Sequence, residues 1–482
     1  MMYISGIGPK FLPTAVRVDY MTMVSCSRLF FCGFIGNWQT IKDTKMEDKQ
    51  MHTNTNSWIL KGMICYSKSK EELSVMENGY LVCCQGICQG VFPSIPEEFK
   101  SLPLTDYQDA LIFPGMTDLH LHAPQYPFCG LGMDLELLEW LENHTFPEES
   151  RYCSLDYARQ AYGIFTEDLK VSPTTRAVIF STIHSPATKL LMDLLEDTGL
   201  ATYVGKVNMD QNCPDFLREA DAHAALEDTR QWLKDTMNAY RHTKPILTPR
   251  FAPTCSAALM EGLGKLQREY GLPVQSHLSE NLSETAWVKE LFPWSSFYGD
   301  VYDRFGLFGS GKGNNAPAVM AHCVHSPREE VLRMKEKGVF VAHCPQSNTN
   351  LSSGIAPIRS YLEEGLFIGL GTDLAGGTNL SMFRCITDAI AVSKLYWRLV
   401  DQSAKPLTLE EGFYLATIGG GSFFGKVGSF EKGYEADVLV ADDSLIPRPQ
   451  GQSIQNRLAR FIYLSLEKGK LIGKYVAGRK IF

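Results

Sequence analysis

The sequence predicts an α/β fold, in which a (β/α)₈ barrel carries a small β-sandwich built from both ends of the chain. Three observations lead to this prediction. Short apolar runs, each followed by a stretch with helical spacing, recur through the middle of the chain. Strand-and-turn patterns occupy the two ends. The length of 482 residues exceeds the roughly 250 that one barrel needs, which leaves room for a smaller module.

Eight apolar runs are the predicted barrel strands. They are near-continuously hydrophobic and rich in β-branched residues, as expected of parallel strands that are covered on both faces. Eight such runs alternating with helical stretches imply a closed barrel, whose active site lies at the C-terminal ends of the strands. The runs are 111–122, 177–184, 202–209, 245–251, 273–278, 318–324, 338–344 and 367–373.

Two β modules flank this middle part. Residues 58–67 and 79–92 have the composition of strands, with a turn signal at 77–79. Residues 428–442 and 470–482 repeat the pattern at the other end of the chain. Because each module alone is small, we expect one sandwich assembled from both. The predicted boundaries are 57–113 and 425–482 for the two sandwich parts and 114–424 for the barrel.

Residues 1–56 do not share these patterns. They contain six methionines and Asn/Thr-rich stretches, without sustained periodicity. We interpret them as a poorly ordered N-terminal extension, or as sequence upstream of a true start at Met46 or Met51.

Composition narrows the functional class. A net charge of −8 argues against a nucleic-acid or polybasic membrane partner and leaves a small neutral substrate open. The 13 cysteines form no CxxC pair, which disfavours zinc ribbons, redox motifs and secreted disulfide frameworks. No apolar stretch approaches the roughly 18 residues of a spanning helix, and no signal peptide is evident. We therefore expect a cytoplasmic protein with reduced thiols.

Polar side chains stand where the apolar runs end, and the barrel would bring them to one mouth. The first run ends in His120-Leu121-His122. Residues i and i+2 of a strand point to the same side, so both imidazoles face the barrel interior. A histidine in such a place can also be a structural core residue, but the pair favours metal binding. The other run ends supply Arg250, His277, His322 and Asp373, while His184 stays ambiguous.

The neighbours of His277 and Asp373 favour catalysis. Glu280 follows His277 by three residues, which places a proton-shuttling carboxylate beside a ligand candidate. A buried Asp373 needs a cation to offset its desolvation. Three histidines and one aspartate with an open position for water are typical of a catalytic zinc site. His322 is the candidate for a further polar group over that water.

Together these segments resemble the amidohydrolase superfamily and, within it, the guanine deaminases. The resemblance runs from about residue 58 onward and is carried by PGMTDLHLHAPQYPFCGLGMDLELLEWLENHTFPEE, TPRFAPTCS, QSHLSEN, MAHCVH, AHCPQSNTNLSSG and GLGTDLAGG, in that order. The HxH and GTD motifs occur across the superfamily, whereas the long first segment and the PRF tripeptide are more specific.

The resemblance implies a role for each candidate. His120, His122, His277 and Asp373 would hold one zinc ion per chain. Glu280, His322 and Asp373 would carry the catalysis, and the substrate would contact Gln125, Arg250, Phe251, His277, Glu280 and His322. The expected reaction is the hydrolysis of guanine to xanthine and ammonia, a step of purine catabolism. The resemblance also implies a homodimer.

Two alternatives to this function are compatible with the sequence. Another mononuclear amidohydrolase, acting on a different amino-heterocycle, would keep the zinc site and change the base contacts. A catalytically retired scaffold would keep the barrel, although such proteins usually lose a ligand or the proton shuttle, and here all of these groups are present.

Overall fold

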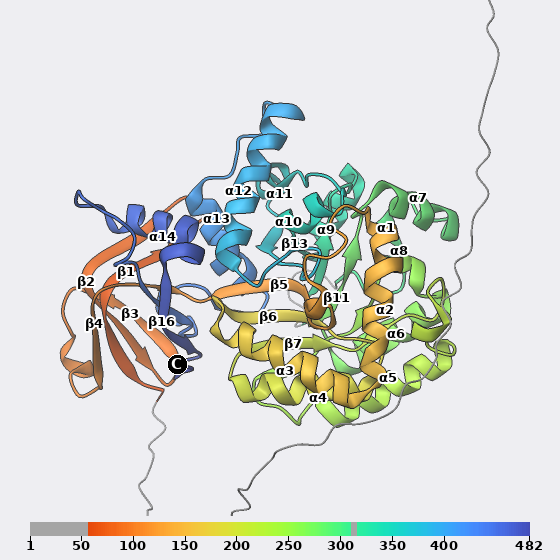
Figure 1. Ribbon diagram of the computed structural model, residues 1–482, viewed down its shortest axis with the longest axis horizontal. Helices are drawn as coiled ribbons and strands as arrows, with labels where there is room; N and C mark the ends of the chain where they lie inside the picture. The colour runs from red at the N-terminus through yellow and green to blue at the C-terminus, as the bar shows by residue number, and fades with distance from the viewer. Residues whose placement is uncertain (1–55, 310–315) are drawn as a thin grey trace, which may run out of the picture. The chain divides into compact units, whose positions relative to one another are not determined.

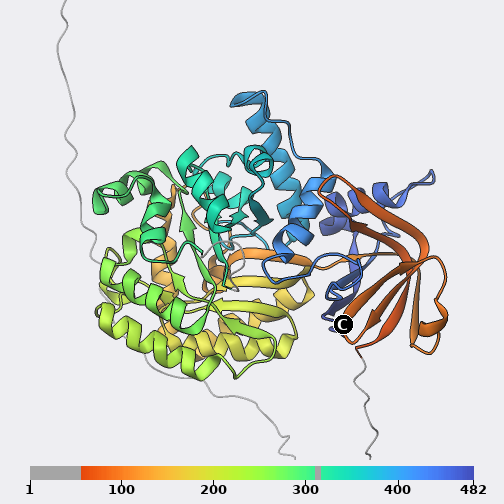
Figure 2. The same ribbon diagram turned by 180° about the vertical axis from the view of Figure 1, so that it is seen from behind.

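The computed structural model describes residues 56–309 and 316–482, which all fall in one unit of the chain, Asn54–Phe482. The predicted N-terminal extension lies outside the described residues, apart from Asn56. Figures 1 and 2 show two opposite sides of this unit, with a barrel of strands and helices beside a sheet that contains both ends of the described chain. No helix within the described residues is long and apolar enough to cross a membrane.

The barrel is built from two parallel four-stranded sheets and the bridges between them. One sheet has the order β5-β6-β7-β9 and the other β11-β12-β13-β14. Their strands are β5 (Met116–His122), β6 (Thr174–Phe180), β7 (Ala201–Gly205), β9 (Thr243–Pro245), β11 (Val274–Leu278), β12 (Ala318–His322), β13 (Phe340–His343) and β14 (Phe367–Leu370). Two short strands, β8 (Val207–Asn208) and β10 (Thr248–Pro249), follow the third and fourth barrel strands along the chain and pair with each other.

Backbone hydrogen bonds close the ring at both seams. On one side, Leu247 bridges Val274 in parallel, which joins the β9–β10 segment to β11. On the other side, the backbone N–H of Asp373 donates to the carbonyl of His120 at 2.8 Å. The α/β barrel predicted from the eight apolar runs is therefore present.

Helices cover the outside of this barrel (Figure 1). Many begin at a side chain that accepts a backbone N–H: Ser154 caps α3 and Ser256 caps α6. Several end at a glycine in the left-handed region, such as Gly271 (φ 64°), which lets the chain turn back to the next strand. The helices are α3 (Leu155–Val171), α4 (Ser185–Thr198), α5 (Ala222–Thr236), α6 (Ala257–Tyr270), α7 (Leu282–Leu291), α8 (Tyr298–Arg304), α9 (Arg328–Lys337), α10 (Pro345–Asn350), α11 (Ile358–Glu364) and α12 (Met382–Leu399).

A group of short helices follows β5 and lies over the mouth of the barrel. It comprises the 3₁₀-helix η2 (Ala123–Phe128), α1 (Leu137–Trp140), the π-helix η3 (Leu141–Thr145) and α2 (Phe146–Ser150). Near the other end of the barrel segment, α13 (Leu409–Tyr414) continues into a second π-helix, η7 (Leu415–Gly419).

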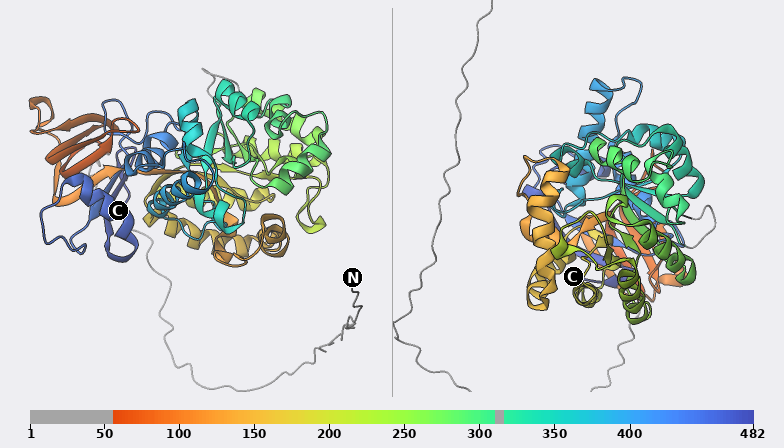
Figure 3. Two further views of the ribbon diagram at one scale, coloured as in Figure 1. Left: turned by 90° about the horizontal axis from the view of Figure 1, so that it is seen from above. Right: turned by 90° about the vertical axis from the view of Figure 1, so that its right-hand side faces the viewer.

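The two ends of the described chain build one mixed sheet of seven strands, in the order β17-β16-β15-β4-β1-β2-β3. Figure 3 shows its orange N-terminal and blue C-terminal strands lying together. The sheet curls around a small core of its own, because Trp58 of β1 and Tyr475 of β16 lie 5.0 Å apart across two intervening strands. The strands are β1 (Trp58–Ser67), β2 (Leu73–Cys84), β3 (Ile87–Phe92), β4 (Leu104–Pro114), β15 (Val438–Asp442), β16 (Lys470–Val476) and β17 (Arg479–Lys480).

Four details differ from the sequence prediction. The first apolar run, 111–122, is divided at Gly115: its first part belongs to β4 of the chain-end sheet and its second part to β5. The second barrel strand ends at Phe180, so His184 lies beyond it at the N-cap of α4. The predicted turn at 77–79 is a β-bulge inside the continuous strand β2, where Asn78 has a positive φ of 49°. An unpredicted helix, α14 (Ile454–Lys468), covers the sheet.

Candidate active site

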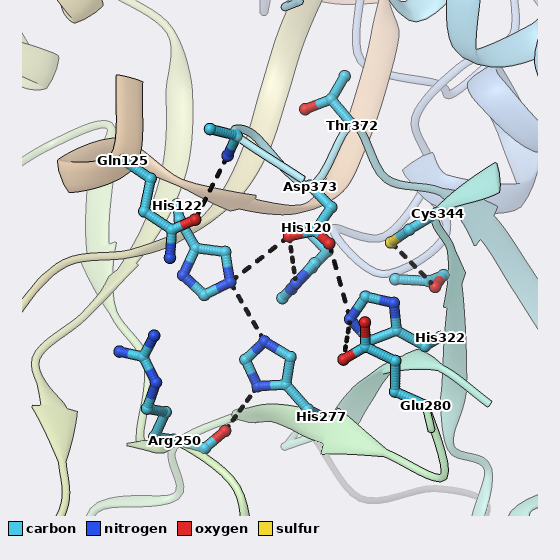
Figure 4. A network of polar contacts seen from close by, with 12 residues as sticks. His120, His122, Gln125, Arg250, His277, Glu280, His322, Cys344, Thr372 and Asp373 are labelled. Atoms are coloured by element: carbon cyan, nitrogen blue, oxygen red, sulfur yellow. Dashed lines mark hydrogen bonds and ion pairs between the residues drawn. The ribbon is translucent and has the colours of Figure 1, made fainter. Parts of the chain in front are cut away.

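The C-terminal end of the barrel gathers the predicted metal ligands (Figure 4). His120 and His122 come from β5, where the two-residue spacing turns both rings inward, and both are almost fully buried. His277 comes from β11 on the opposite sheet. Asp373 lies in the loop after β14, and its backbone is tied to His120 across the seam.

The ligand atoms of these four residues converge on one point. His122 Nε2 lies 3.2 Å from His277 Nε2. Asp373 Oδ1 lies 3.2 Å from His120 Nε2 and 3.5 Å from His122 Nε2. Four ligands at about 2.0–2.1 Å from a tetrahedral ion stand about 3.3 Å from one another. The spacing therefore fits donors that share a single ion.

The hydrogen bonds and protonation of the histidines fit the same ion. His277 Nδ1 donates to the carbonyl of Arg250 at 2.6 Å, which leaves the lone pair of Nε2 free for the centre. The buried His120 Nε2 has no hydrogen-bond partner within the described residues. Burial lowers the pKa of His122 and His277 well below the usual value, helped by the neighbouring imidazole of His120. Neutral imidazoles are the form that binds a metal.

A second candidate set of metal ligands shares two residues with the first. His120, His322 and Asp373 also bring their ligand atoms within 4.8 Å of one another. His322 Nε2 is 3.8 Å from Asp373 Oδ2 and 3.4 Å from Glu280 Oε2. His322 Nδ1 contacts Asn348 Oδ1 at 2.9 Å, so the ring donates there and its Nε2 points at the two carboxylates.

Glu280 is placed to carry a proton. Burial, with the charge of Asp373 adding to it, raises the pKa of Glu280 well above the usual value. Ser353 Oγ donates to Glu280 Oε1 at 3.2 Å, which leaves Oε2 directed toward His322. A carboxyl group whose pKa is raised by burial, beside a second carboxylate, has the properties of a general acid and base.

A pocket of about 410 Å³, counted to its open mouth, adjoins this cluster. Its polar wall carries Gln125, Arg250 and Glu284, while the short helices over the barrel mouth supply an apolar cover. Phe251 lies edge-on to His277, with ring centroids 6.5 Å apart. An apolar cover combined with a few polar groups suits a small aromatic heterocycle. The complete lining is His122, Gln125, Leu137, Trp140, Leu141, Arg250, Phe251, His277, Glu280, Glu284, His322, Leu351 and Asp373.

The backbone at the strand ends is held in an uncommon conformation. Ser279, His322, Cys323 and Asp373 all have positive φ, between 47° and 74°. A non-glycine residue in this region is disfavoured by roughly 1–2 kcal/mol. Such residues persist where the surrounding structure fixes them, and they cluster at functional sites.

A model of the amidohydrolase family matches residues 111–479. The chain belongs to the amidohydrolase family. The guanine deaminase of Dictyostelium discoideum is 37% identical over 430 residues, covering 87% of this chain and 91% of the relative. That of Escherichia coli K12 is 34% identical over 429 residues, covering 85% and 92%. A solved guanine deaminase from C. acetobutylicum, with guanine bound in its active site, has a TM-score of 0.85 and 46% identity, covering 88% of this chain and all of the other.

In this amidohydrolase the predicted residues meet at one place. All of the residues predicted for substrate contact, catalysis or metal binding line the pocket, except His120, which lies behind it. His184 lines no part of the pocket and its Nε2 has no hydrogen-bond partner within the described residues.

Sequence reasoning missed several residues behind the pocket. Asp118 accepts hydrogen bonds from the backbone N–H groups of His120 and Thr372, at 3.2 and 3.0 Å. Glu149 pairs with Arg250. Asn348 and Ser353 orient His322 and Glu280. Asp118 stands inside the TDLHLH run and Glu149 at the end of the long first segment, but neither carried a signal of its contacts.

Proposed function

We propose that this amidohydrolase is a zinc-dependent guanine deaminase, which hydrolyses guanine to xanthine and ammonia. One observation carries the proposal: a single pocket has a metal-type cluster and a buried acid at one wall and two hydrogen-bond donors, Arg250 and Gln125, at another. The relative that holds guanine in its active site, at 46% identity, supports the same substrate.

The proposed metal ligands are His120, His122, His277 and Asp373, around one zinc ion per chain. Three imidazoles and one carboxylate would hold the ion, and water would take a fifth position, as catalytic zinc sites keep a position open. When bound, the ion would supply the Lewis acidity that makes water nucleophilic at neutral pH. The overlapping set that includes His322 makes that residue the alternative ligand.

The proton transfers are assigned to the carboxylates. Asp373 Oδ2, which faces His322, accepts the proton of the attacking water as its oxygen bonds to C2 of guanine. Glu280 gives its proton to ring N3, which makes C2 more electrophilic. Glu280, now a carboxylate, takes the remaining proton of the C2 hydroxyl and passes it to the exocyclic amine; the C2–N bond breaks, ammonia leaves, C2 keeps a carbonyl, and the proton held by Asp373 returns to Glu280. His322 Nε2 lies 3.4 Å from Glu280 Oε2 and 3.8 Å from Asp373 Oδ2, where the ring would polarise the attacking water.

Recognition is assigned to the opposite wall. Arg250 and Gln125 lie almost fully buried there and offer N–H donors. The carbonyl at C6 of guanine is an acceptor, and Phe251 provides an apolar surface for the ring. A base with an amino group at C6 would leave buried donors unpaired, which a hydrogen-bonding site rejects strongly.

We further propose a homodimer in the cytoplasm. Eleven cysteines of the described residues are unpaired, although most are buried, which fits a reducing compartment. The dimer follows from the resemblance to the family, and light scattering of the purified protein would test it.

The test is the formation of xanthine from guanine by purified protein, with zinc measured in the same sample. We expect about one zinc per chain, loss of turnover after treatment with a chelator, and recovery on adding one equivalent of zinc. Zinc without guanine turnover would redirect the assignment to another amino-heterocycle. Absence of both would indicate a retired scaffold.

A further inference from the structure

Glu149 is a buried carboxylate that touches both base-recognition residues without lining the pocket. It lies on α2, its exposed fraction is 0%, and it is absent from the pocket lining. A carboxylate buried so completely needs partners that offset its desolvation. Those partners are Arg250 and Gln125.

The contacts of Glu149 fix the guanidinium of Arg250. Arg250 Nη1 donates to Glu149 Oε2 at 2.5 Å, and Nη2 donates to Oε1 at 3.1 Å. This two-pronged pairing holds the plane of the guanidinium as well as its position. The same short helix supplies Phe146, whose ring lies 5.3 Å from the guanidinium carbon. Arg250 is thus held from α2 on two sides.

Glu149 also decides which way the amide of Gln125 faces. Gln125 Nε2 donates to Glu149 Oε1 at 2.9 Å, and the backbone N–H of Ala375 donates to Gln125 Oε1 at 3.3 Å. Both oxygens of Glu149 already accept hydrogen bonds from Arg250, so the nitrogen of the amide, and not its oxygen, faces Glu149. Gln125 keeps a second N–H that no described residue accepts, as does Arg250.

We propose that Glu149 is the positioning residue that sets the hydrogen-bonding polarity of this wall. By holding Arg250 and Gln125 together, it makes the wall a pair of donors, suited to the adjacent acceptors O6 and N7 of a 6-oxopurine. The inference rests on the proposed function and deepens it, because it names the residue on which discrimination between 6-oxo and 6-amino purines depends.

The variant Glu149→Gln tests this. The amide of the variant carries N–H groups at the position where Glu149 accepts hydrogen bonds from Gln125 and Arg250. The amide of Gln125 can then rotate, so that its oxygen faces the pocket. Arg250 loses its charge partner. We expect KM for guanine to rise about tenfold or more, with a smaller change in kcat. We expect the ratio of kcat/KM for guanine to that for 2,6-diaminopurine, which has an amino group at C6, to fall at least about tenfold.

Controls separate positioning from general damage. Glu148→Gln alters the neighbouring buried carboxylate, whose partner is Tyr157 outside the pocket, and should leave the ratio unchanged. Glu149→Asp keeps the charge but shortens the side chain, which weakens its two-pronged contact with Arg250; it should lower the ratio less than Glu149→Gln does, and that partial fall carries the test if Glu149→Gln does not fold. Zinc content should be unchanged in all variants, because Glu149 contacts no proposed ligand.

The outcomes are distinguishable. An unchanged KM and ratio in Glu149→Gln, with normal wild-type turnover, would overturn the inference alone. The same holds if Glu148→Gln reproduces the effect, since the role would then be structural. Absence of guanine turnover in the wild type would overturn the proposed function, and this inference with it.

Discussion

Buried carboxylates serve different purposes in this molecule according to what lies against each of them. Glu280 faces His322, and burial, with the charge of Asp373 adding to it, raises the pKa of Glu280. Glu149 accepts hydrogen bonds from an arginine and an amide and so holds both in place. Asp118 accepts hydrogen bonds from backbone N–H groups and a hydroxyl. The residue type is shared, and the environment sets the role.

Glu280→Gln keeps the size of the side chain and removes its ability to transfer a proton. We expect kcat to fall by about 10²–10⁴-fold, the usual contribution of a general acid or base. Zinc content and the melting temperature should stay close to the wild-type values, since Glu280 is not a proposed ligand. Xanthine formation followed by absorbance, with metal analysis of the same sample, provides the measurement. Residual activity within tenfold of wild type would exclude Glu280 as the proton shuttle.

Asp118→Ala removes the anchor between β5 and the loop that carries Asp373. It leaves buried N–H groups of His120 and Thr372 unpaired, each at a loss of about 1–3 kcal/mol. We expect a lower melting temperature and a zinc affinity reduced about 10–100-fold, as for other residues behind metal ligands. Thr372→Val is the matched control, because it deletes only the hydroxyl that donates to Asp118. Equal effects from both variants would contradict this account.

At the scale of elements, the positions of strand ends decide which side chains reach the site. The apolar runs show that strands exist, but propensity does not show where each ends, so His184 was expected nearer the site than it lies. Asn78-Gly79 gives the same local signal for a turn and for a bulge, since both need a positive φ. Hydrogen bonding along β2 decides between them, and that is a non-local property.

The candidate site could be predicted where a residue and its function share one motif. The two-residue spacing of His120 and His122 in a strand indicates a metal site. The short distance along the chain from His277 to Glu280 indicates a proton carrier. Glu149 could not be predicted, because its contact with Arg250 spans about 100 residues and has no periodic signal. The roles of Asn348 and Ser353 are hidden for the same reason.

Glu196 joins α4 to the start of β9 and gives the fold a dependence on pH. Burial tends to raise the pKa of Glu196, but backbone N–H groups of residues 241, 242 and 243 outweigh it, so the pKa lies below the usual value. The stabilisation is therefore complete above the unfolded pKa of about 4.3 and is lost as the pH falls through the lower folded value. We expect Glu196→Gln to melt at a lower temperature than wild type at pH 7.

The difference between this variant and wild type should shrink toward pH 3, and thermal unfolding followed by circular dichroism across that range provides the measurement. Asp197→Asn is the control, because the side chain of Asp197 makes no hydrogen bond or ion pair with the described residues. The melting temperature of this variant should follow that of wild type across the pH range. A constant difference across the range would show that Glu196 acts through shape alone.

At the scale of the whole unit, buried polar contacts join the barrel to the chain-end sheet. Arg176 of β6 donates from Nε to Asp437 Oδ2 at 2.7 Å and from Nη2 to Asp437 Oδ1 at 3.0 Å. Lys474 of β16 donates to the carbonyls of Lys170 and Ser172 at the end of α3. The barrel and the sheet are thus connected by buried polar groups: the ion pair of Arg176 with Asp437 and the amine of Lys474, whose pKa burial lowers to about 7.

Arg176→Met removes the ion pair between Arg176 and Asp437 and leaves the fully buried Asp437 without its cation. Loss of one partner of a buried pair is expected to destabilise the fold by about 3–5 kcal/mol. Glu435→Gln weakens only the partly exposed ion pair between Arg176 and Glu435. It should change the free energy of unfolding by about 1 kcal/mol or less. Melting temperatures of both variants provide the measurement. A small effect of Arg176→Met would mean that the two modules are held by apolar packing alone.

The shared sheet has a consequence during synthesis. One edge of β4 is completed by β15, yet about 320 residues separate them along the chain. At about 10 residues per second, the ribosome needs roughly half a minute to supply the missing strand. Throughout that interval the edge of β4 offers unpaired N–H and C=O groups to any other nascent chain. The yield of this protein in cells should therefore depend on chaperone supply and on the rate of translation across the barrel.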